Sequence, residues 1–441
     1  MSTLLICNVQ IVNEGLIQEA DVFIRNGRIA RIEADLSHLV AKQVIDGAGK
    51  HLIPGVIDTE CRLHQCSDAL AGWEQESKAA IVGGITSSLI IPSASPDNSV
   101  SALCLDRANT SFNNFAVYHR ARHRDLAEIE GLNPFDCCGV YVDMASEQDE
   151  FRIDDPEILS EMLGVSPVIV AVHAEDAPSI LENEESYRQI YGDDVPFYLH
   201  SSVRSAQACY IAASQILEIA VKTGARAHLL HVSSVKEIEL LKRLRKQSSM
   251  ISAGVCSHYL TFSDADYADR EGLLKCEPSI KTDIDRAALL QGLLDNNIDV
   301  ISSGHTPIKL PEKQGQYFST SSGLPLAQYT VPAILEHYQD QIVSLECIVE
   351  KTSHAVAERF AIKDRGYIRE GYWADLVLVD VEDSFIARDE DVVSSAGWTV
   401  FNGKEFRSSV VKTIVNGHVV WSDEVFSYPE SVGVPLTFHK C

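Results

Sequence analysis

Short apolar runs separated by turn residues fill the first fifty residues and predict β-strands there. The pair Asn26-Gly27 stands between two such runs, which is a strong signal for a hairpin with a two-residue turn. The same pattern returns near the other end, where we expect a strand within residues 371–380 and a hairpin within residues 411–420. Strand-rich segments at both ends can pair into one β unit, which places the two termini together.

The middle of the chain changes to short apolar runs that alternate with longer amphipathic ones. Helical periodicity is clear in residues 205–223 and 235–245. The strand candidates lie at residues 84–91, 139–142, 167–173, 227–232, 250–255 and 298–303. Strand and helix alternating over most of the chain predict an α/β fold with a parallel sheet, and the length favours a closed TIM-type (β/α)8 barrel.

This change of pattern divides the chain into three segments. We expect residues 53–366 to form the barrel, and residues 1–52 and 367–441 to form one small β-sandwich. A barrel of about 250 to 300 residues plus a smaller unit accounts for a chain of this length.

The charge balance limits the partners that the chain can have. Asp and Glu number 63 against 37 Lys and Arg, so the formal net charge is −26. A surface of this sign repels phosphate backbones, and we expect no nucleic-acid partner. The sequence has no charged-then-apolar leader and no apolar run of about 18 residues, so we expect neither secretion nor a membrane span. The eleven cysteines are scattered without a Cys-x-x-Cys pair, which favours buried, reduced thiols and a cytoplasmic location.

Candidate chemical residues lie at the predicted carboxyl ends of strands, where barrels of this type place their active sites. His173 and His231 follow two successive strand candidates, and zinc accepts imidazole ligands. A histidine near a strand end is more often a hydrogen-bonded structural residue, so this signal is weak by itself.

The motifs around these residues are more specific than the histidines. In order they are Pro-Gly-Val-Ile-Asp-Thr at 54–59, Val-His-Ala-Glu-Asp at 172–176, His-Leu-Leu-His-Val-Ser-Ser at 228–234, Val-Cys-Ser-His-Tyr-Leu at 255–260, and Ser-Gly-His-Thr-Pro at 303–307. Together they resemble the amidohydrolase superfamily of metal-dependent hydrolases, and within it dihydroorotase and its allantoinase and hydantoinase relatives. Gly397-Trp398 followed by Phe401-Asn402-Gly403 resembles the C-terminal signature of dihydroorotases.

The resemblance implies two zinc ions, held by a His-x-His pair, a carboxylated lysine, two single histidines and an aspartate that also moves the proton. The two single histidines are present as His173 and His231. The other four metal positions hold different residues, namely Glu60 and Arg62 for the pair, Tyr141 for the lysine and Gly304 for the aspartate.

The positions that the resemblance assigns to substrate are also replaced. They hold His64, Ser93, Glu277 and Ile308, where dihydroorotases have arginine, asparagine, asparagine and histidine. The residues that remain are mostly framework, namely Asp58, Glu175, Asp176, Arg204, His258 and His305.

Two interpretations of the metal positions stay open. Glu60, His173 and His231 are all acceptable ligands for one zinc ion. Arg62 lies on the same strand face as Glu60, and its fixed positive charge repels a divalent cation and pairs more readily with a carboxylate. We therefore expect no cofactor and an Arg62–Glu60 pair, with one zinc ion as the alternative.

Three hypotheses for function follow. The first is a dihydroorotase-like protein, related to pyrimidine biosynthesis, that has lost zinc-dependent hydrolysis and is retained as a structural or interaction subunit. The resemblance implies aspartate transcarbamoylase as the first partner to test, and a homo-oligomer. The second is an active hydrolase of dihydroorotate or another cyclic amide that uses His173 and His231 in a single-metal site. The third is a small-molecule sensor in which Arg62 contacts a carboxylate.

Overall fold

The central part of the chain is a closed barrel of parallel strands. The computed structural model describes residues 2–62, 69–93, 110–427 and 430–440. The barrel strands are β6 (Val56–Arg62), β7 (Ile85–Ile91), β8 (Asn114–Val117), β9 (His119–Arg120), β10 (Val140–Asp143), β11 (Val170–His173), β12 (Ala227–Leu229), β13 (Ile251–Cys256) and β14 (Val300–Ser302). The pairing runs β6-β7-β8 and β9-β10-β11-β12-β13-β14. The Arg62 N–H donates to the His305 carbonyl oxygen at 2.7 Å and joins the first strand to the last. The predicted α/β barrel is confirmed.

The third strand of the barrel is the one that the apolar pattern did not indicate. It consists of β8 and β9, which are separated by Tyr118, and the Tyr118 N–H donates to the Ile90 carbonyl oxygen at 3.0 Å. All its residues are buried, but polar side chains such as His119 and Arg120 stand where an apolar run is expected. A strand that turns polar groups toward a site does not give the hydrophobic signal of a buried strand.

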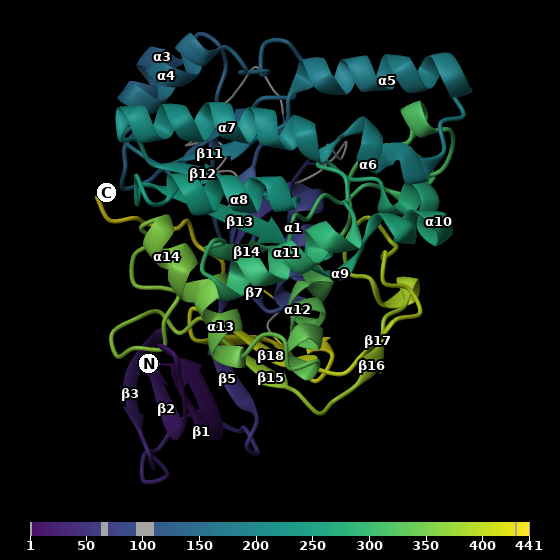
Figure 1. Cartoon of the computed structure of the whole chain (residues 1–441). Coiled ribbons are helices and arrows are strands. Elements are labelled where there is room, and N and C mark those ends of the chain that lie inside the picture. The colour runs from purple at the N-terminus through teal and green to yellow at the C-terminus, as the bar shows by residue number, and fades with distance from the viewer. Residues whose placement is uncertain (1, 63–68, 94–109, 428–429, 441) are drawn as a thin grey trace.

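Helices cover the outside of the barrel (Figure 1). They are α1 (Ala69–Val82), α3 (Leu126–Glu130), α4 (Pro156–Val165), α5 (Ala177–Tyr191), α6 (His200–Val203), α7 (Ala206–Thr223), α8 (Val235–Leu244), α9 (Ser257–Thr261), α10 (Tyr267–Arg270), α11 (Asp283–Leu294), α12 (Thr330–Gln339), α13 (Leu345–Val349) and α14 (Ala355–Arg359). The two helices that the periodicity predicts are α7 and α8. Ser205 caps α7 by accepting a hydrogen bond from the Ala208 N–H, and Gly224 ends it with a φ of +72°.

Both ends of the chain build a second, nine-stranded sheet with its own apolar core. Its strands are β1 (Thr3–Asn13), β2 (Leu16–Arg25), β3 (Arg28–Glu33), β4 (Gln43–Asp46), β5 (His51–Pro54), β15 (Leu376–Asp380), β18 (Ser409–Val415), β19 (His418–Ser422) and β20 (Val425–Phe426). Strand β5 pairs with β1 on one side and with β15 on the other, so it joins the two chain ends. A short separate ribbon pairs β16 (Phe385–Ile386) with β17 (Glu405–Phe406).

Asn-Gly turns make the predicted hairpins of this sheet. Asn26 and Gly27 have φ angles of 52° and 80°, and Asn416 and Gly417 have φ angles of 50° and 75°. Two successive left-handed residues form the turn type whose twist matches paired strands. The last residues leave the sheet, because the Leu436 N–H donates to the Phe115 carbonyl oxygen at 2.8 Å. The chain therefore ends beside the barrel and not beside its N-terminal strand (Figure 1).

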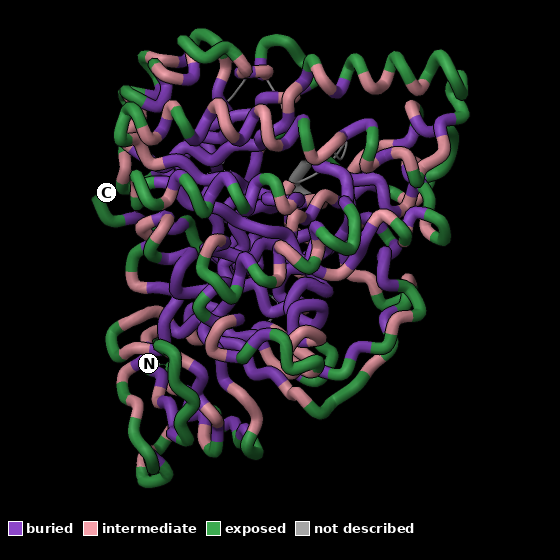
Figure 2. The backbone as a smooth tube through the Cα atoms, in the orientation of Figure 1, coloured by how far each residue is buried: buried purple, intermediate pink, exposed green. Residues whose placement is uncertain are grey.

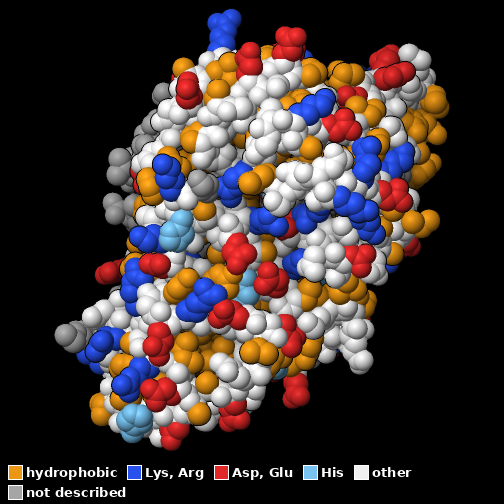
Figure 3. Space-filling view, turned by 60° about the vertical axis from the view of Figure 1, so that its left-hand side comes forward, with side chains coloured by type: hydrophobic (Ala, Val, Ile, Leu, Met, Phe, Trp, Pro, Cys, Tyr) orange, Lys and Arg blue, Asp and Glu red, His pale blue; other side chains and the backbone are white. Residues whose placement is uncertain are grey.

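Burial is concentrated in the barrel and at its contact with the second sheet (Figure 2). On the face shown in Figure 3, acidic, basic and hydrophobic side chains are interspersed. None of the helices within the described residues combines the length and the hydropathy that a membrane span needs. The carboxyl ends of the barrel strands surround a polar cavity.

Candidate functional site

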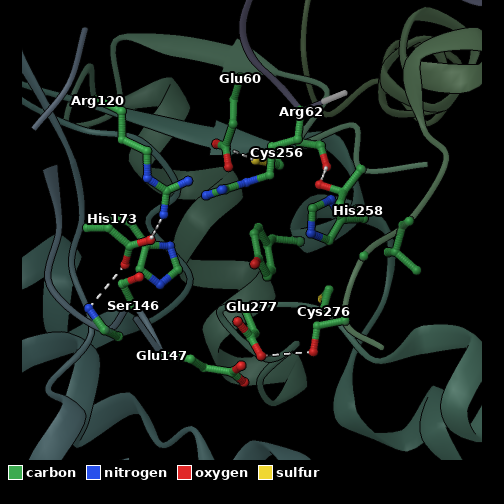
Figure 4. A pocket seen from close by; sticks show the side chains of 18 of the residues that line it. Glu60, Arg62, Arg120, Ser146, Glu147, His173, Cys256, His258, Cys276 and Glu277 are labelled. Carbon is green, nitrogen blue, oxygen red and sulfur yellow. Dashed lines mark hydrogen bonds and ion pairs between the residues drawn. The ribbon is translucent and has the colours of Figure 1, made fainter. Parts of the chain in front are cut away.

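A cavity of about 310 Å³ lies at the carboxyl ends of the barrel strands (Figure 4). Its wall takes residues from several strand ends and from the loops that follow them. These residues include Glu60, Arg62, Arg120, Asp143, Ser146, Glu147, His173, Cys256, His258, Cys276, Glu277, Gly304, Thr306 and Ser322. Glu60, Arg62, His173, Glu277 and Gly304 were predicted as site residues, and the structure brings all five to this wall.

His173 and His231 contact each other directly. The distance from His173 Nδ1 to His231 Nε2 is 2.8 Å, and the two ring centroids are 4.6 Å apart. The other nitrogen of His173, Nε2, lies 3.0 Å from Glu175 Oε2. Both nitrogens of His173 are therefore engaged, and a proton lies between the two rings.

Arg204 anchors this histidine pair through Glu175. Its NH2 group lies 2.8 Å from Glu175 Oε2, and its Nε donates to the same carboxylate. Burial alone raises the pKa of Glu175, but Arg204 and His173 hold it well below its usual range. For His231, burial and the adjacent His173 lower the pKa, so this ring is neutral. The result is a buried chain of charge-assisted hydrogen bonds from Arg204 to His231.

Glu60 makes a different contact from the one expected. Its Oε1 lies 3.6 Å from His231 Nε2, and its Oε2 accepts a hydrogen bond from Cys256 Sγ at 3.2 Å. Burial raises the pKa of Glu60 to about 7, with Arg62 opposing the shift. The carboxyl therefore keeps its proton to a higher pH than an exposed glutamate does.

Arg62 pairs with Tyr141 and not with Glu60, which corrects the expected Arg62–Glu60 pair. Its NH2 group donates to the Tyr141 hydroxyl at 2.6 Å, and that hydroxyl donates to Asp143 Oδ2 at 3.3 Å. Arg120 reaches the same carboxylate oxygen at 3.2 Å. The Cζ atoms of Arg62 and Arg120 lie 5.3 and 5.4 Å from the centre of the Tyr141 ring, within cation–π distance. The sequence suggested a carboxylate partner because Glu60 is two residues away, but the Tyr141 phenol is the partner that lies within reach.

The side chains present do not fit a two-zinc centre. Three protein ligands on zinc must converge to about 2.0–2.3 Å from one point. Within the described residues, one group of three His, Cys, Asp or Glu side chains has its possible ligand atoms within 4.8 Å of one another. It consists of His119, Asp125 and Glu128, which do not line this cavity. A single ion held by Glu60, His173 and His231 requires these side chains to move and the proton between the two rings to leave.

Gly304, at the position where the resemblance expects an aspartate, has little room for a side chain. Its φ is +66°, and a Cβ atom there would lie 2.8 Å from Cys256 Sγ and 2.9 Å from His258 Cε1. A left-handed backbone and two close neighbours both favour glycine. The backbone and the packing around residue 304 therefore both disfavour an aspartate at this position.

The positions that the dihydroorotase resemblance assigns to substrate lie in different surroundings. Glu277 lines the cavity, is 3.1 Å from Arg204 NH1, and accepts a hydrogen bond from Ser322 at 2.9 Å. Ser93 is exposed, and Ile308 is buried next to Trp398, whose Nε1 donates to the Ile308 carbonyl oxygen at 2.7 Å. His64 lies outside the described residues.

Several residues of the cavity wall were not predicted from the sequence, and three of them lie on barrel strands. Arg120 lies on the undetected third strand, while Asp143 and Cys256 end strands β10 and β13. Asp143 is two residues after Tyr141, so the alternation of a strand places both on one face. That spacing is the signal that identifies Asp143.

Two framework residues that the motifs emphasise do not line the cavity. Asp58 accepts hydrogen bonds from the Ser303 N–H and hydroxyl, which ties β6 to the loop after β14. His305 contacts Glu76 at 2.9 Å and accepts from the Leu326 N–H. These residues hold the strand ends in place.

Comparisons with known proteins agree with this architecture. No protein-family model matches the chain. It is 28% identical to an allantoinase of Desulfitobacterium hafniense, over 99% of both chains, and 27% identical to a dihydroorotase of Endomicrobium trichonymphae, over 91% of this chain and 94% of that one. The solved L-hydantoinase (dihydropyrimidinase) of Arthrobacter aurescens superposes with a TM-score of 0.92 at 22% identity, over 99% of this chain and all of that chain. These similarities support a relationship to the amidohydrolase superfamily and a resemblance to dihydroorotase.

Proposed function

We propose that this chain is a dihydroorotase-like protein in which zinc-dependent hydrolysis has been lost and which is retained as a structural or interaction subunit. A cyclic-amidohydrolase relationship is the premise, since allantoinase and dihydroorotase relatives cover nearly the whole chain. The observation that carries the proposal is the Arg62–Tyr141–Asp143 network, which places a guanidinium and a phenol at former metal positions.

The chemistry of the replacements supports loss of turnover. General acid or base assistance contributes about 10²- to 10⁴-fold in rate, and Gly304 has no group to provide it. Zinc would supply an activated water and polarise the amide carbonyl, worth several kcal/mol more. Tyr141 is buried, and burial raises the pKa of its phenol, so it stays protonated and is no substitute for a carboxylated lysine.

Metal analysis of the purified protein tests this proposal. The full chain is prepared in zinc-supplemented medium, and its zinc content and hydrolysis of dihydroorotate, allantoin and hydantoin are measured. We expect less than one tenth of an equivalent of zinc and no turnover. Stoichiometric zinc together with turnover would overturn the proposal.

A single-metal hydrolase is the second candidate, because Glu60 and both histidines lie close to one another. His231 Nε2 is 2.8 Å from His173 Nδ1 and 3.6 Å from Glu60 Oε1. If this candidate is correct, any hydrolysis found by substrate screening disappears in the His173→Ala/His231→Ala variant. Turnover that survives in this variant rejects it.

The proposal for an interaction subunit needs a partner. We infer aspartate transcarbamoylase as the first one to test, on the dihydroorotase resemblance, together with a homo-oligomer. Light scattering of the chain alone and after mixing with that enzyme measures both. A monomer that does not change mass on mixing counts against both inferences.

A further inference from the structure

A second hollow lies between the short ribbon β16–β17 and the end of the nine-stranded sheet, away from the barrel cavity. This hollow, the ribbon groove, has a volume of about 1100 Å³, and its described lining residues are all different from those of the barrel cavity. In Figure 1 the ribbon lies to the right of β15 and β18. Small-molecule pockets typically have volumes of about 300–1,000 Å³, so the ribbon groove suits a longer ligand than a metabolite.

The floor of the ribbon groove is apolar. With one exception, its apolar side chains are buried or half-buried, and they include Val82, Tyr329, Pro332, Phe385, Trp421 and Phe426. The exception is Ile386, which is 43% exposed. The rings of Trp421 and Phe426 pack edge to face with their centroids 5.0 Å apart. An apolar side chain that covers this floor removes hydrophobic surface from water, which favours binding.

The rim of the ribbon groove is acidic. Among the described residues its charged side chains are all exposed, and they are one arginine, Arg388, and the five acids Asp383, Asp391, Glu405, Asp423 and Glu424. Asp391 lies 3.9 Å from Arg388, and Asp423 lies 3.0 Å from Lys412. In the same part of the chain, the other three acids form no ion pair with a Lys or Arg at 4.0 Å or less. The rim therefore attracts a cationic partner.

The turn between β19 and β20 brings two of these acids to the rim. Asp423 and Glu424 form a two-residue turn in which both φ angles are positive, at 52° and 61°. The other two-residue turns of this sheet have glycine at the second position, namely Gly15, Gly27 and Gly417. A glutamate there is unfavourable for the backbone, so the turn itself does not account for Glu424. Its carboxylate contributes to the charge of the rim instead.

We propose that the ribbon groove binds an extended segment of a partner protein in which basic residues alternate with apolar ones. Side chains of an extended segment alternate between two sides, so the apolar set can cover the floor. The long stems of Lys and Arg let the basic set reach the carboxylates of the rim. A compact cation would leave the floor uncovered. The ribbon groove is separate from the barrel cavity, so this inference goes beyond the proposed function and holds with or without zinc.

Three synthetic peptides with a fluorescent label test this proposal on the full-length protein. The first alternates lysines with Val and Phe, the second has Glu in place of each Lys, and the third has Ser in place of each apolar residue. Dissociation constants are measured by fluorescence anisotropy at an ionic strength of about 0.15 M. We expect the first peptide to bind at least tenfold more tightly than each of the others. If it does not bind, or if the third binds equally well, the inference is wrong, because the net charge of −26 then attracts any cation.

Charge variants locate the binding. The triple variant Asp383→Asn/Glu405→Gln/Glu424→Gln should weaken binding of the first peptide at least fivefold. The matched control is Asp269→Asn/Glu19→Gln/Glu161→Gln, which removes the same charge at exposed positions outside the groove and should bind within twofold of wild type. An equal loss in both variants would mean that the overall charge of the protein, and not the groove, decides the affinity.

Apolar variants test the floor. Ile386→Ser should weaken binding at least threefold, whereas Ile284→Ser on helix α11, where the isoleucine is 74% exposed, should leave it unchanged. We also expect the first peptide to change the tryptophan emission of the wild type, and this change should disappear in Trp421→Phe. Emission that does not respond, or that responds equally in Trp421→Phe, would place the peptide elsewhere and overturn the inference.

A second copy of this chain is the alternative occupant. Light scattering measures the mass of the wild type and of Ile386→Ser. If the wild type is a dimer that Ile386→Ser dissociates and the first peptide does not bind, a second copy fills the groove and the inference is wrong. Zinc content and turnover are measured on the same preparations. Failure of the peptides to bind leaves a zinc-free, inactive protein as support for the proposed function, and stoichiometric zinc with turnover rejects the proposed function without affecting the peptide result.

Discussion

The imidazole rings of His173 and His231 are hydrogen-bonded to each other, with 2.8 Å between Nδ1 and Nε2. Since Glu175 binds the other side of His173, and Arg204 binds Glu175, the pair belongs to a buried polar network that is complete without a metal. Hydrogen bonding therefore accounts for the presence of His173 and His231 without a zinc ion.

Removal of His173 should destabilise the fold. His173→Ala leaves Glu175 with one partner fewer and His231 without its hydrogen bond, which should lower the free energy of unfolding by about 2–4 kcal/mol. Urea unfolding followed by circular dichroism measures the change. His38→Ala, at an exposed position, is the control and should cost less than about 0.5 kcal/mol. A loss as small as the control's would mean that the network is not structural.

Glu60 should make stability depend on pH. Burial raises its pKa from 4.5 to about 7, so the folded state holds a proton that the unfolded state releases between these values. The folded state binds more protons in this window, and the free energy of unfolding therefore falls as pH rises from about 4.5 to 7. Glu60→Gln should reduce that fall by up to about 3 kcal/mol, measured as the difference between variant and wild type.

The control for Glu60 is an exposed glutamate. Glu19→Gln changes the same charge on the surface and should leave the pH profile unchanged. Parallel profiles for wild type and Glu60→Gln would contradict the buried-carboxyl interpretation.

An aspartate at position 304 should destabilise the fold. Gly304→Asp forces a residue with a Cβ into a φ of +66° beside Cys256 and His258, at an expected cost of about 2–4 kcal/mol. Gly397→Asp is a close control, because Gly397 has a φ of +69° and no atom within 4 Å of its Cβ position. We expect Gly304→Asp to melt at a lower temperature than Gly397→Asp. Equal melting temperatures would show that the contacts of residue 304 are easily relieved.

Removal of the Tyr141 hydroxyl should release Arg62 and Asp143 together. Tyr141→Phe deletes the acceptor for Arg62 at 2.6 Å and the donor to Asp143 at 3.3 Å, at a cost of about 1–3 kcal/mol. Thermal unfolding checks this, with Tyr198→Phe at an exposed tyrosine as the control. A neutral effect would mean that Arg62 finds another partner of equal strength.

The sequence predicted those parts of the fold that depend on short-range patterns. The Asn26-Gly27 turn, helix α7 and most of the barrel strands follow from local spacing. The third strand was missed because Arg120 and its polar neighbours serve the site and break the apolar pattern. The partner of Arg62 was predicted wrongly, because Tyr141 is 79 positions away in sequence and only the barrel brings the two side chains together.

The left-handed backbone at Gly304 also bears on how this chain can change over time. An aspartate gained there in one step meets Cys256 and His258 before any neighbour has adjusted, so the first intermediate on a path back to hydrolysis is a weakened protein. Changes that relieve both neighbours have to come earlier, when they bring no benefit of their own. If the proposed loss of catalysis is correct, the order in which substitutions are tolerated makes it hard to reverse, and descendants of this chain should diversify the pocket and not recover the zinc centre.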